Sequence, residues 1–443
     1  MSWRDRPELL AVLAVAGQAI AYVLSVVLAR RLGVAEFEAY AVAASAFILM
    51  ANVAPQGLEK YGLRLLPVLI EREDWPRARG FVRFGFRRTL WGALLAGVIV
   101  AALAGRLPSI PPGVRLAVLA SCLVTPIGAL VHFAFETLSA AGREIRAAVA
   151  FRAAAPAVTL AAFGLASAIT LPLTGAVAAA CWGVGWVSAL ALLAAELRRA
   201  LPAQVWSAPP LAEGARWAAE ARPFWVYRIA LGLMAQAGVI SLDRLQPSSA
   251  AVGAYAAAMA TASLALVLVT ATNRAYARRL SILLERREFD AVITLRRQRL
   301  WWLAPVIAVF ILAAFIWTRP LLALFRPEFV ADGTAPLRIL AVATAVSMLF
   351  ALSPTYLKFS RRNRATFVTV ACGAAAQVLL LLLLVPRFGA TGAAIAYAVS
   401  TIGMYGAFAL MAHQAIEGQG AHVNSAAPRP DCQQRGSKCG DEL

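Results

Sequence analysis

Residues 153–195, AAAPAVTLAAFGLASAITLPLTGAVAAACWGVGWVSALALLAA, contain no charged side chain. A membrane-spanning helix needs about 20 apolar residues, so this stretch is too long for one span and long enough for two. A proline and a glycine interrupt it at residues 171–175, LPLTG, and these residue types favour a turn. The stretch therefore predicts two transmembrane helices, at 150–170 and 175–195, joined by a short turn.

The composition of the whole chain is that of a membrane protein. The 443 residues are 61% hydrophobic and 15% charged, whereas soluble domains are roughly half apolar and a quarter charged. Further apolar runs bring the prediction to about twelve transmembrane helices in an all-α polytopic membrane protein. These runs lie at 9–29, 39–58, 89–105, 116–137, 224–242, 251–273, 300–318, 339–357, 365–385 and 391–415.

The basic residues predict the orientation of these helices. If the chain starts inside, the inner segments hold 31 of the 42 Lys and Arg residues and the outer segments hold 9, and Lys60 and Arg64 lie at the inner end of the second span. Positively charged residues stay on the cytoplasmic side of a membrane, so we expect both termini in the cytoplasm. The net charge is +19. Because the basic residues lie between apolar runs and not on a soluble domain, we expect no nucleic-acid partner.

The chain contains an internal repeat with an offset near 215 residues. Residues 38–41 (EAYA) match 253–256 (GAYA), and residues 69–75 (LIEREDW) match 283–289 (LLERREF). Each copy has six predicted spans, an even number, so both copies enter the membrane in the same direction. The repeat predicts two pseudo-symmetric six-helix bundles around a central cleft, which is typical of transporters.

The repeat and the polar segments together predict four regions. Residues 1–195 form an N-terminal bundle, and 223–416 form a C-terminal bundle. The longer, Pro-containing segment 196–222 is predicted to be a cytoplasmic linker between them. Residues 417–443, rich in Gly, Ser, Pro and Gln, cannot bury a core and are predicted to be a disordered cytoplasmic tail.

Cations near the inner ends of the predicted helices are candidates for substrate binding. Lys60 and Arg64 are four residues apart, on one helical face, and the repeat aligns Lys60 with Arg274. Such cations around a cleft would suit a diphosphate, which needs charge-assisted hydrogen bonds to leave water. Arg228 and Gln236 lie on the seventh predicted helix, within reach of the same cleft. The alternative is that these cations extend to the membrane interface and bind nothing.

Three ionisable residues are candidates for ion coupling. His132 and Glu136 are four residues apart on the fourth predicted helix, a spacing that allows a hydrogen bond and a protonation switch. Glu59 is a further candidate, since charges within membrane helices commonly mark function. The alternative for the His132 and Glu136 pair is a satisfied helix-packing contact.

The acidic and histidine residues are too few to indicate an enzyme. Only seven Asp and three His are present, without an Asp-x-Asp or His-x-x-x-His spacing. The predicted outer connections are short, so they leave no room for an extracytoplasmic catalytic domain. We expect no metal site and no cofactor, and a membrane enzyme or a non-transporting scaffold is disfavoured.

Several segments resemble bacterial oligosaccharide flippases of the Wzx type, which belong to the multidrug/oligosaccharidyl-lipid/polysaccharide (MOP) exporter superfamily. The similarity extends over about residues 9–415. The matching segments are 29–40 (ARRLGVAEFEAY), 57–67 (GLEKYGLRLLP), 74–79 (DWPRAR), 324–329 (LFRPEF) and 385–396 (VPRFGATGAAIA).

This resemblance implies a function and a location. It implies twelve helices in two bundles around a central cleft, in the bacterial cytoplasmic (inner) membrane. It also implies translocation of polyprenyl-diphosphate-linked oligosaccharide, a precursor of cell-surface polysaccharide, from the inner to the outer leaflet. Expected partners are this lipid-linked glycan, membrane lipid, and a glycan polymerase or glycosyltransferases. Departures from the family pattern at Glu59 and Lys60 leave the glycan open.

Other transporters stay as alternatives. A drug or small-molecule antiporter related to the MATE (multidrug and toxin extrusion) transporters would belong to the same superfamily, but it would need acidic residues deep in the cleft to bind organic cations. A flippase for lipid II-type peptidoglycan precursors would fit the same architecture. A major facilitator transporter shares the six-plus-six plan, but the Gly-x-x-x-Asp-Arg-x-Gly pattern of that class is absent between the second and third helices.

Overall fold

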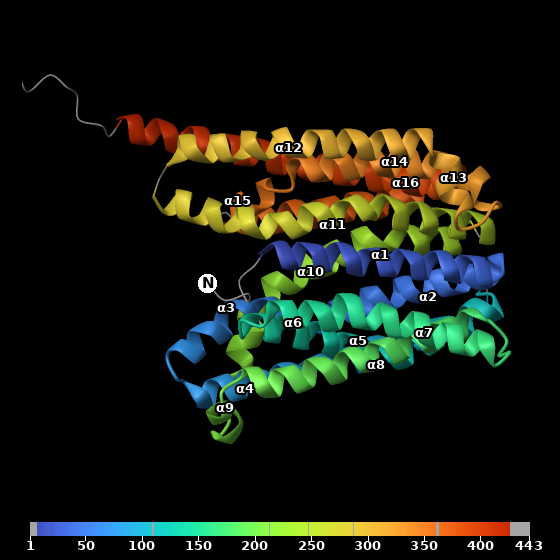
Figure 1. Ribbon diagram of the computed structural model, residues 1–443, viewed down its shortest axis with the longest axis horizontal. Coiled ribbons are helices and arrows are strands. Elements are labelled where there is room, and N and C mark those ends of the chain that lie inside the picture. Colours follow the sequence, from blue (N-terminus) through green and yellow to red (C-terminus); the bar gives the residue numbers. More distant parts are fainter. Residues whose placement is uncertain are drawn as a thin grey trace, which may run out of the picture.

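The computed structural model describes residues 7–108, 110–211, 213–246, 248–286, 288–359 and 363–425. These residues form helices and short connections. The helices run roughly parallel to one long direction and lie in two neighbouring groups (Figure 1). We call the first six spans the N-terminal bundle and the remainder the C-terminal bundle.

The N-terminal bundle contains one irregular span. Its fifth span consists of α6, η2 and α7, in which η2 is a turn of π-helix. The elements of this bundle are α1 (Pro7–Arg31), α2 (Val34–Val53), α3 (Leu58–Glu71), α4 (Trp75–Arg106), α5 (Pro112–Ala140), α6 (Glu144–Ala148), η2 (Val149–Ala154), α7 (Ala155–Ala168) and α8 (Gly175–Ala200).

The C-terminal bundle follows a short connecting helix, α9 (Ala203–Ser207). Its last element bends at Gly389, whose φ of 52° departs from helical geometry. The elements are α10 (Gly214–Leu245), α11 (Ser249–Glu285), α12 (Phe289–Ile316), α13 (Thr318–Ala323), α14 (Phe329–Phe350), α15 (Ser353–Phe359) and α16 (Asn363–Ser425).

The spans agree with the predicted fold class. Eleven helical segments of the described chain are long and apolar enough to cross a membrane. One of them, Arg364–Ile416, has 53 residues, and the bend at Gly389 divides it into two spans, each near the required length. The predicted split after the fifth span is also confirmed. There α7 ends at Ala168, and the Thr174 side chain caps α8 by accepting a hydrogen bond from the Val177 amide.

Pro55, Gly57 and Gly62 in the sequence predict an irregular second span, and the structure confirms it. Helix α2 ends at Val53, and Gln56 and Gly57 both adopt left-handed backbone conformations before α3 begins. A Cβ atom on Gly57 would lie 2.4 Å from the Ala221 carbonyl oxygen of α10. Glycine therefore permits both the turn and the close approach of α10 to this break.

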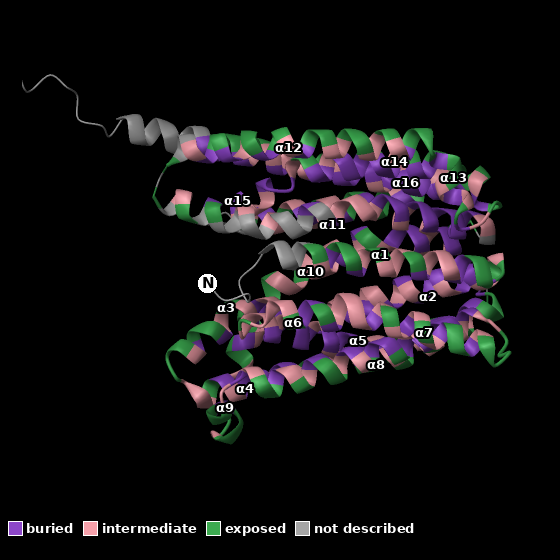
Figure 2. Ribbon diagram, viewed as in Figure 1, coloured by how far each residue is buried: buried purple, intermediate pink, exposed green. Residues whose placement is uncertain are grey.

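Large apolar side chains cover the outside of the bundles, as expected for contact with lipid. Leu123 on α5 is 81% exposed and Trp301 on α12 is 77% exposed. Buried residues concentrate where helices face one another, with exposed residues along the outer faces (Figure 2). Continuous apolar surface of this kind would be an aggregation hazard in water and is the normal surface in a bilayer.

The two ends of the molecule differ in composition. One end, here called the basic end, holds α3, α9, α15 and the connection between the bundles. The opposite, short-loop end holds the α1–α2 and α7–α8 turns and α13 (Figure 1). Helix α8 continues to Ala200 and α10 begins at Gly214, so the two ends of the predicted linker 196–222 are helical. Likewise α16 continues to Ser425, and residues 426–443 of the predicted tail lie outside the described residues.

Candidate functional site

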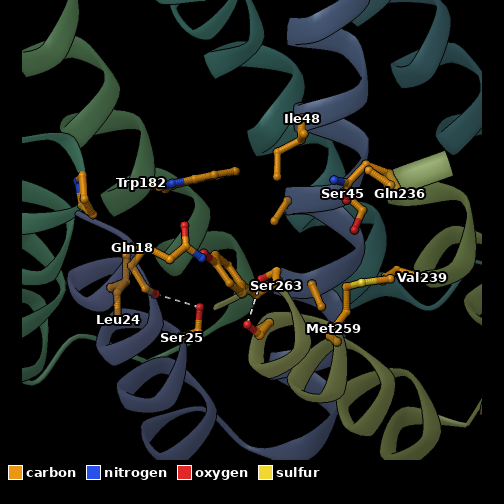
Figure 3. A pocket seen from close by; sticks show the side chains of 18 of the residues that line it. Gln18, Leu24, Ser25, Ser45, Ile48, Trp182, Gln236, Val239, Met259 and Ser263 are labelled. Atoms are coloured by element: carbon orange, nitrogen blue, oxygen red, sulfur yellow. Dashed lines mark hydrogen bonds between the residues drawn. The ribbon is translucent and has the colours of Figure 1, made fainter. Parts of the chain in front are cut away.

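A cavity of about 450 Å³ lies between the two bundles. Helices α1, α2, η2, α7 and α8 line it from the N-terminal bundle, and α10 and α11 line it from the C-terminal bundle. Figure 3 shows Gln18, Ser45, Trp182, Gln236 and Ser263 around this space. The cavity corresponds to the central cleft that the sequence predicted between the bundles.

Arg152 is the one charged residue among the described residues that line the cavity. It lies in the π-helical turn η2, a feature that is common at functional sites because it inserts an extra residue into a helix. The turn is packed closely on α1, since a Cβ atom on Gly17 would lie 2.3 Å from the Arg152 carbonyl oxygen. The backbone around Arg152 is therefore held in place by α1.

The cavity has an aromatic wall that comes from the N-terminal bundle. Tyr40 and Trp182 have ring centroids 6.2 Å apart, and Trp182 meets Trp186 edge-on at 5.9 Å. Phe151 extends the wall, with its ring 5.5 Å from Trp186. The Trp186 indole nitrogen is buried and has no hydrogen-bond partner among the described residues. The opposite wall presents smaller side chains, such as Ser263.

Four of the predicted site residues form two ion pairs outside the cavity lining. The Lys60 ammonium lies 2.5 Å from a Glu136 carboxylate oxygen. The Glu59 carboxylate lies 3.3 Å from the Arg228 guanidinium, and the Glu59 side chain is only 1% exposed. Arg228 also donates a hydrogen bond to Asn52 of α2. The Glu59–Arg228 pair thus joins α3 of one bundle to α10 of the other.

The remaining predicted residues take different positions. Gln236 lines the cavity. The Arg64 guanidinium lies 5.0 Å from the centre of the Phe224 ring. His132 packs against the Phe151 and Trp186 rings behind the aromatic wall, whereas Glu136, its predicted neighbour in a switch, is bonded to Lys60. Arg274 lies in α11, and its side chain is outside the described part of the structure.

Sequence reasoning missed Arg152 although a signal was present. The residue falls inside the predicted span 150–170, where a charge is costly and commonly functional. The signal is hidden when Arg152 is counted with the cytoplasmic flank of that span. Weighing each cation by its depth within a span, and not only by its side of the membrane, singles it out.

Comparison with solved structures identifies the fold. A multidrug-resistance MATE family transporter of the MOP superfamily in its inward-facing conformation superimposes with a TM-score of 0.72 over 93% of this chain and 99% of that chain, at 13% sequence identity. The chain has the MATE fold. An outward-facing structure of a MATE family transporter of the same superfamily gives a TM-score of 0.65 at 12% identity, covering 94% and 97%.

A third similar structure is that of a MOP superfamily transporter from Pyrococcus furiosus. It superimposes with a TM-score of 0.68 at 12% identity, over 94% of this chain and 96% of that chain. For that transporter, the reverse polarity of the binding pocket is described as suggesting a different function. No family model and no curated protein matches the present sequence.

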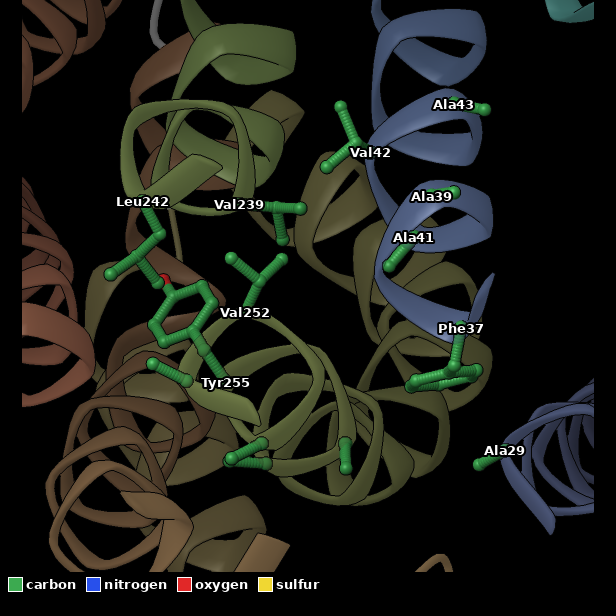
Figure 4. Close-up of a cluster of buried hydrophobic side chains, with 14 of the residues drawn as sticks. Ala29, Phe37, Ala39, Ala41, Val42, Ala43, Val239, Leu242, Val252 and Tyr255 are labelled. Atoms are coloured by element: carbon green, nitrogen blue, oxygen red, sulfur yellow. The ribbon is translucent and has the colours of Figure 1, made fainter. Parts of the chain in front are cut away.

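In this MATE fold the two bundles contact each other at the short-loop end of the cleft. One buried apolar cluster includes Phe37 and Val42 of α2, Val239 of α10 and Tyr255 of α11 (Figure 4). The Phe37 ring also lies 5.6 Å from the Phe329 ring of α14. Side chains from both bundles therefore pack against one another at the short-loop end.

Proposed function

We propose that this protein is a flippase that moves a polyprenyl-diphosphate-linked oligosaccharide from the inner to the outer leaflet by alternating access. The MATE fold and the cavity between the bundles support a transporter. The charge and the aromatic wall of the cavity are the observations that support this cargo. The drug antiporter of the same superfamily is the less favoured function.

The charge of the cavity favours an anionic head group. Arg152 is the one charged lining residue within the described chain, and none of the described lining residues is acidic. A guanidinium can donate two parallel hydrogen bonds to a phosphate, and the low dielectric of a membrane protein interior strengthens them. An organic cation would find no compensating carboxylate at this lining, and burying an unpaired charge is costly.

The aromatic wall favours a sugar next to that phosphate. Sugar rings have apolar C–H faces that pack on the electron-rich faces of Tyr40, Trp182 and Trp186. The Gln18 and Gln236 amides, which line the cavity, can donate hydrogen bonds to the sugar hydroxyls and accept hydrogen bonds from them. Together, a cation, an aromatic wall and amides recognise a phosphorylated sugar better than they recognise an apolar cation.

The positive-inside rule sets the direction of the proposed movement. It places the basic end in the cytoplasm, so the contacts that close the short-loop end would separate the cavity from the outside. The head group would enter from the basic end while its lipid chain stays in the bilayer. The Glu59–Arg228 pair joins the bundles at the break between α2 and α3. We therefore propose that this pair breaks and re-forms as the bundles rock. The hypothesis that Glu59, His132 and Glu136 couple transport to an ion stays part of this proposal.

The proposed cell biology follows from this cargo. The protein would lie in the bacterial inner membrane, next to glycosyltransferases that complete the lipid-linked glycan and a polymerase that consumes it. Lys60, Arg64 and Arg228 stay candidate phosphate contacts for a state in which their present partners separate. Arg274 stays a candidate on the basis of the sequence repeat.

The test is a set of Arg152 variants in proteoliposomes. Translocation of a polyprenyl-diphosphate oligosaccharide is scored by protection of the glycan from an added glycosidase. Arg152→Gln should slow translocation by about tenfold to a hundredfold, the effect of losing charge-assisted hydrogen bonds, and Arg152→Lys should retain an intermediate rate. Arg115→Gln is the matched control, because Arg115 bonds the Leu107 carbonyl away from the cavity. Unchanged translocation by Arg152→Gln would refute the assignment, and transport of a peptidoglycan precursor alone would redirect it to that cargo.

A further inference from the structure

Two arginines form reciprocal bonds between the bundles at the short-loop end. The Arg30 Nε atom, at the end of α1, donates to the Leu324 carbonyl oxygen at 2.6 Å. The Arg326 Nε atom, after α13, donates to the Ala29 carbonyl oxygen at 2.7 Å. Each bundle thus supplies one guanidinium and one backbone acceptor to the same contact.

The acceptors are carbonyl groups at helix ends. Ala29 lies in the last turn of α1, and Leu324 directly follows α13. The last carbonyl groups of a helix accept no hydrogen bond from within the helix, and they lie at the negative end of its dipole. Each arginine therefore caps a helix of the opposite bundle. The two caps draw together the sequence segments 29–40 and 324–329.

Aromatic rings also join the two bundles at this end. Tyr22 of α1 meets Phe325 edge-on at 5.3 Å, and its hydroxyl lies 3.3 Å from the Thr261 hydroxyl of α11. The rings of Phe37 and Phe329, from opposite bundles, lie 5.6 Å apart. Because Phe325 and Phe329 are almost fully buried, separation of the bundles here would expose aromatic surface as well as the two carbonyls.

Other arginines at this end bond within their own bundle. Arg115 donates to the Leu107 carbonyl of the N-terminal bundle, and Arg338 donates to the Phe315 carbonyl of the C-terminal bundle. At the end of α10, the counterpart of α1, Arg244 is paired with its neighbour Asp243. The crossing bonds of Arg30 and Arg326 are therefore not a general property of arginines at this end.

We propose that Arg30 and Arg326 are positioning residues that hold the short-loop end shut and must release before a head group can leave the cavity. We call this pair of crossing bonds the clasp. The inference rests on the proposed alternating access, and it adds the residues that set how often the outer side opens. Loss of the clasp should shift the protein toward states open at the short-loop end, while the cavity itself is unchanged.

The experiment measures access to the cavity from each side. All five cysteines are replaced, and Ser45, which lines the cavity, is changed to Cys as a reporter. A membrane-impermeant maleimide is added to right-side-out and to inside-out vesicles. In the parent, the reporter should react mainly from the basic side. The double variant Arg30→Gln/Arg326→Gln should increase reaction from the short-loop side by about tenfold or more, the effect of two charge-assisted bonds.

Two controls make the result specific to the clasp. Arg115→Gln should leave the labelling ratio unchanged, and Arg30→Lys/Arg326→Lys should restore part of the closure because an ammonium can also donate to a carbonyl. Reaction from the short-loop side no faster in the double Gln variant than in the parent would overturn the proposal. So would an equal increase in Arg115→Gln, because that would indicate general loosening. The labelling needs no substrate, so its outcome is independent of whether the cargo has been assigned correctly.

Discussion

The Glu59–Arg228 pair allows a quantitative test of how the bundles are joined. The Glu59 side chain is 1% exposed and that of Arg228 20% exposed, with 3.3 Å between their charged atoms. Arg228→Met would leave the buried Glu59 carboxylate without its cation, and breaking one side of a buried ion pair costs about 3–5 kcal/mol. Glu59→Gln removes the charge but keeps a polar amide, so we expect a smaller loss, about 1–3 kcal/mol.

The double variant Glu59→Gln/Arg228→Met distinguishes pairing from two independent effects. Because neither charge remains, its free energy of unfolding should be higher than that of Arg228→Met alone, by roughly 1–3 kcal/mol. The assay is reversible unfolding in mixed micelles, in which added SDS denatures the protein and tryptophan fluorescence reports the transition. If the losses of the two single variants simply add in the double variant, the ion pair does not stabilise the junction of α3 and α10, and the reasoning is refuted.

Two further predictions concern the turn before α3 and the aromatic wall. Gly57→Ala should lower the free energy of unfolding by about 2 kcal/mol or more, because Gly57 has φ of 78° and the added Cβ would meet the Ala221 carbonyl oxygen at 2.4 Å. Gly164→Ala, in α7 with nothing within 4 Å of the added Cβ, should be neutral or stabilising by up to about 1 kcal/mol in the same SDS titration; equal losses in both would contradict the packing argument. Trp182→Ala should slow translocation of the lipid-linked glycan by about tenfold and Trp182→Phe by much less, because stacking contributes about 1 kcal/mol and phenyl keeps an aromatic face. Equal rates for Ala and Phe at this position would show that the ring does not contact the cargo.

The sequence was sufficient for the span count and the irregular second helix. Length, hydropathy and the Pro and Gly positions carry that information locally, as at residues 171–175 and at Pro55. The predicted break at Pro55 matches the left-handed residues Gln56 and Gly57. These features could be predicted because a bilayer tolerates few backbone structures other than a helix.

The partners of the charged residues could not be predicted in the same way. Helical spacing pairs Glu136 with His132, but Glu136 is bonded to Lys60, which is 76 positions away in the sequence. The clasp is further from prediction, because its acceptors are the backbone carbonyls of Ala29 and Leu324, and every residue type carries such a group. Tertiary packing alone decides which carbonyl meets an arginine.

The most direct test of the proposed function compares two cargoes in the same proteoliposomes. A polyprenyl-diphosphate oligosaccharide is scored by protection from an added glycosidase, and a cationic dye is scored by its movement across the membrane, each with and without a proton gradient. A cavity with Arg152 and an aromatic wall predicts protein-dependent movement of the lipid-linked glycan and none of the dye. Movement of the dye, with the glycan left in its original leaflet, would contradict the proposal and assign the protein to small-molecule export.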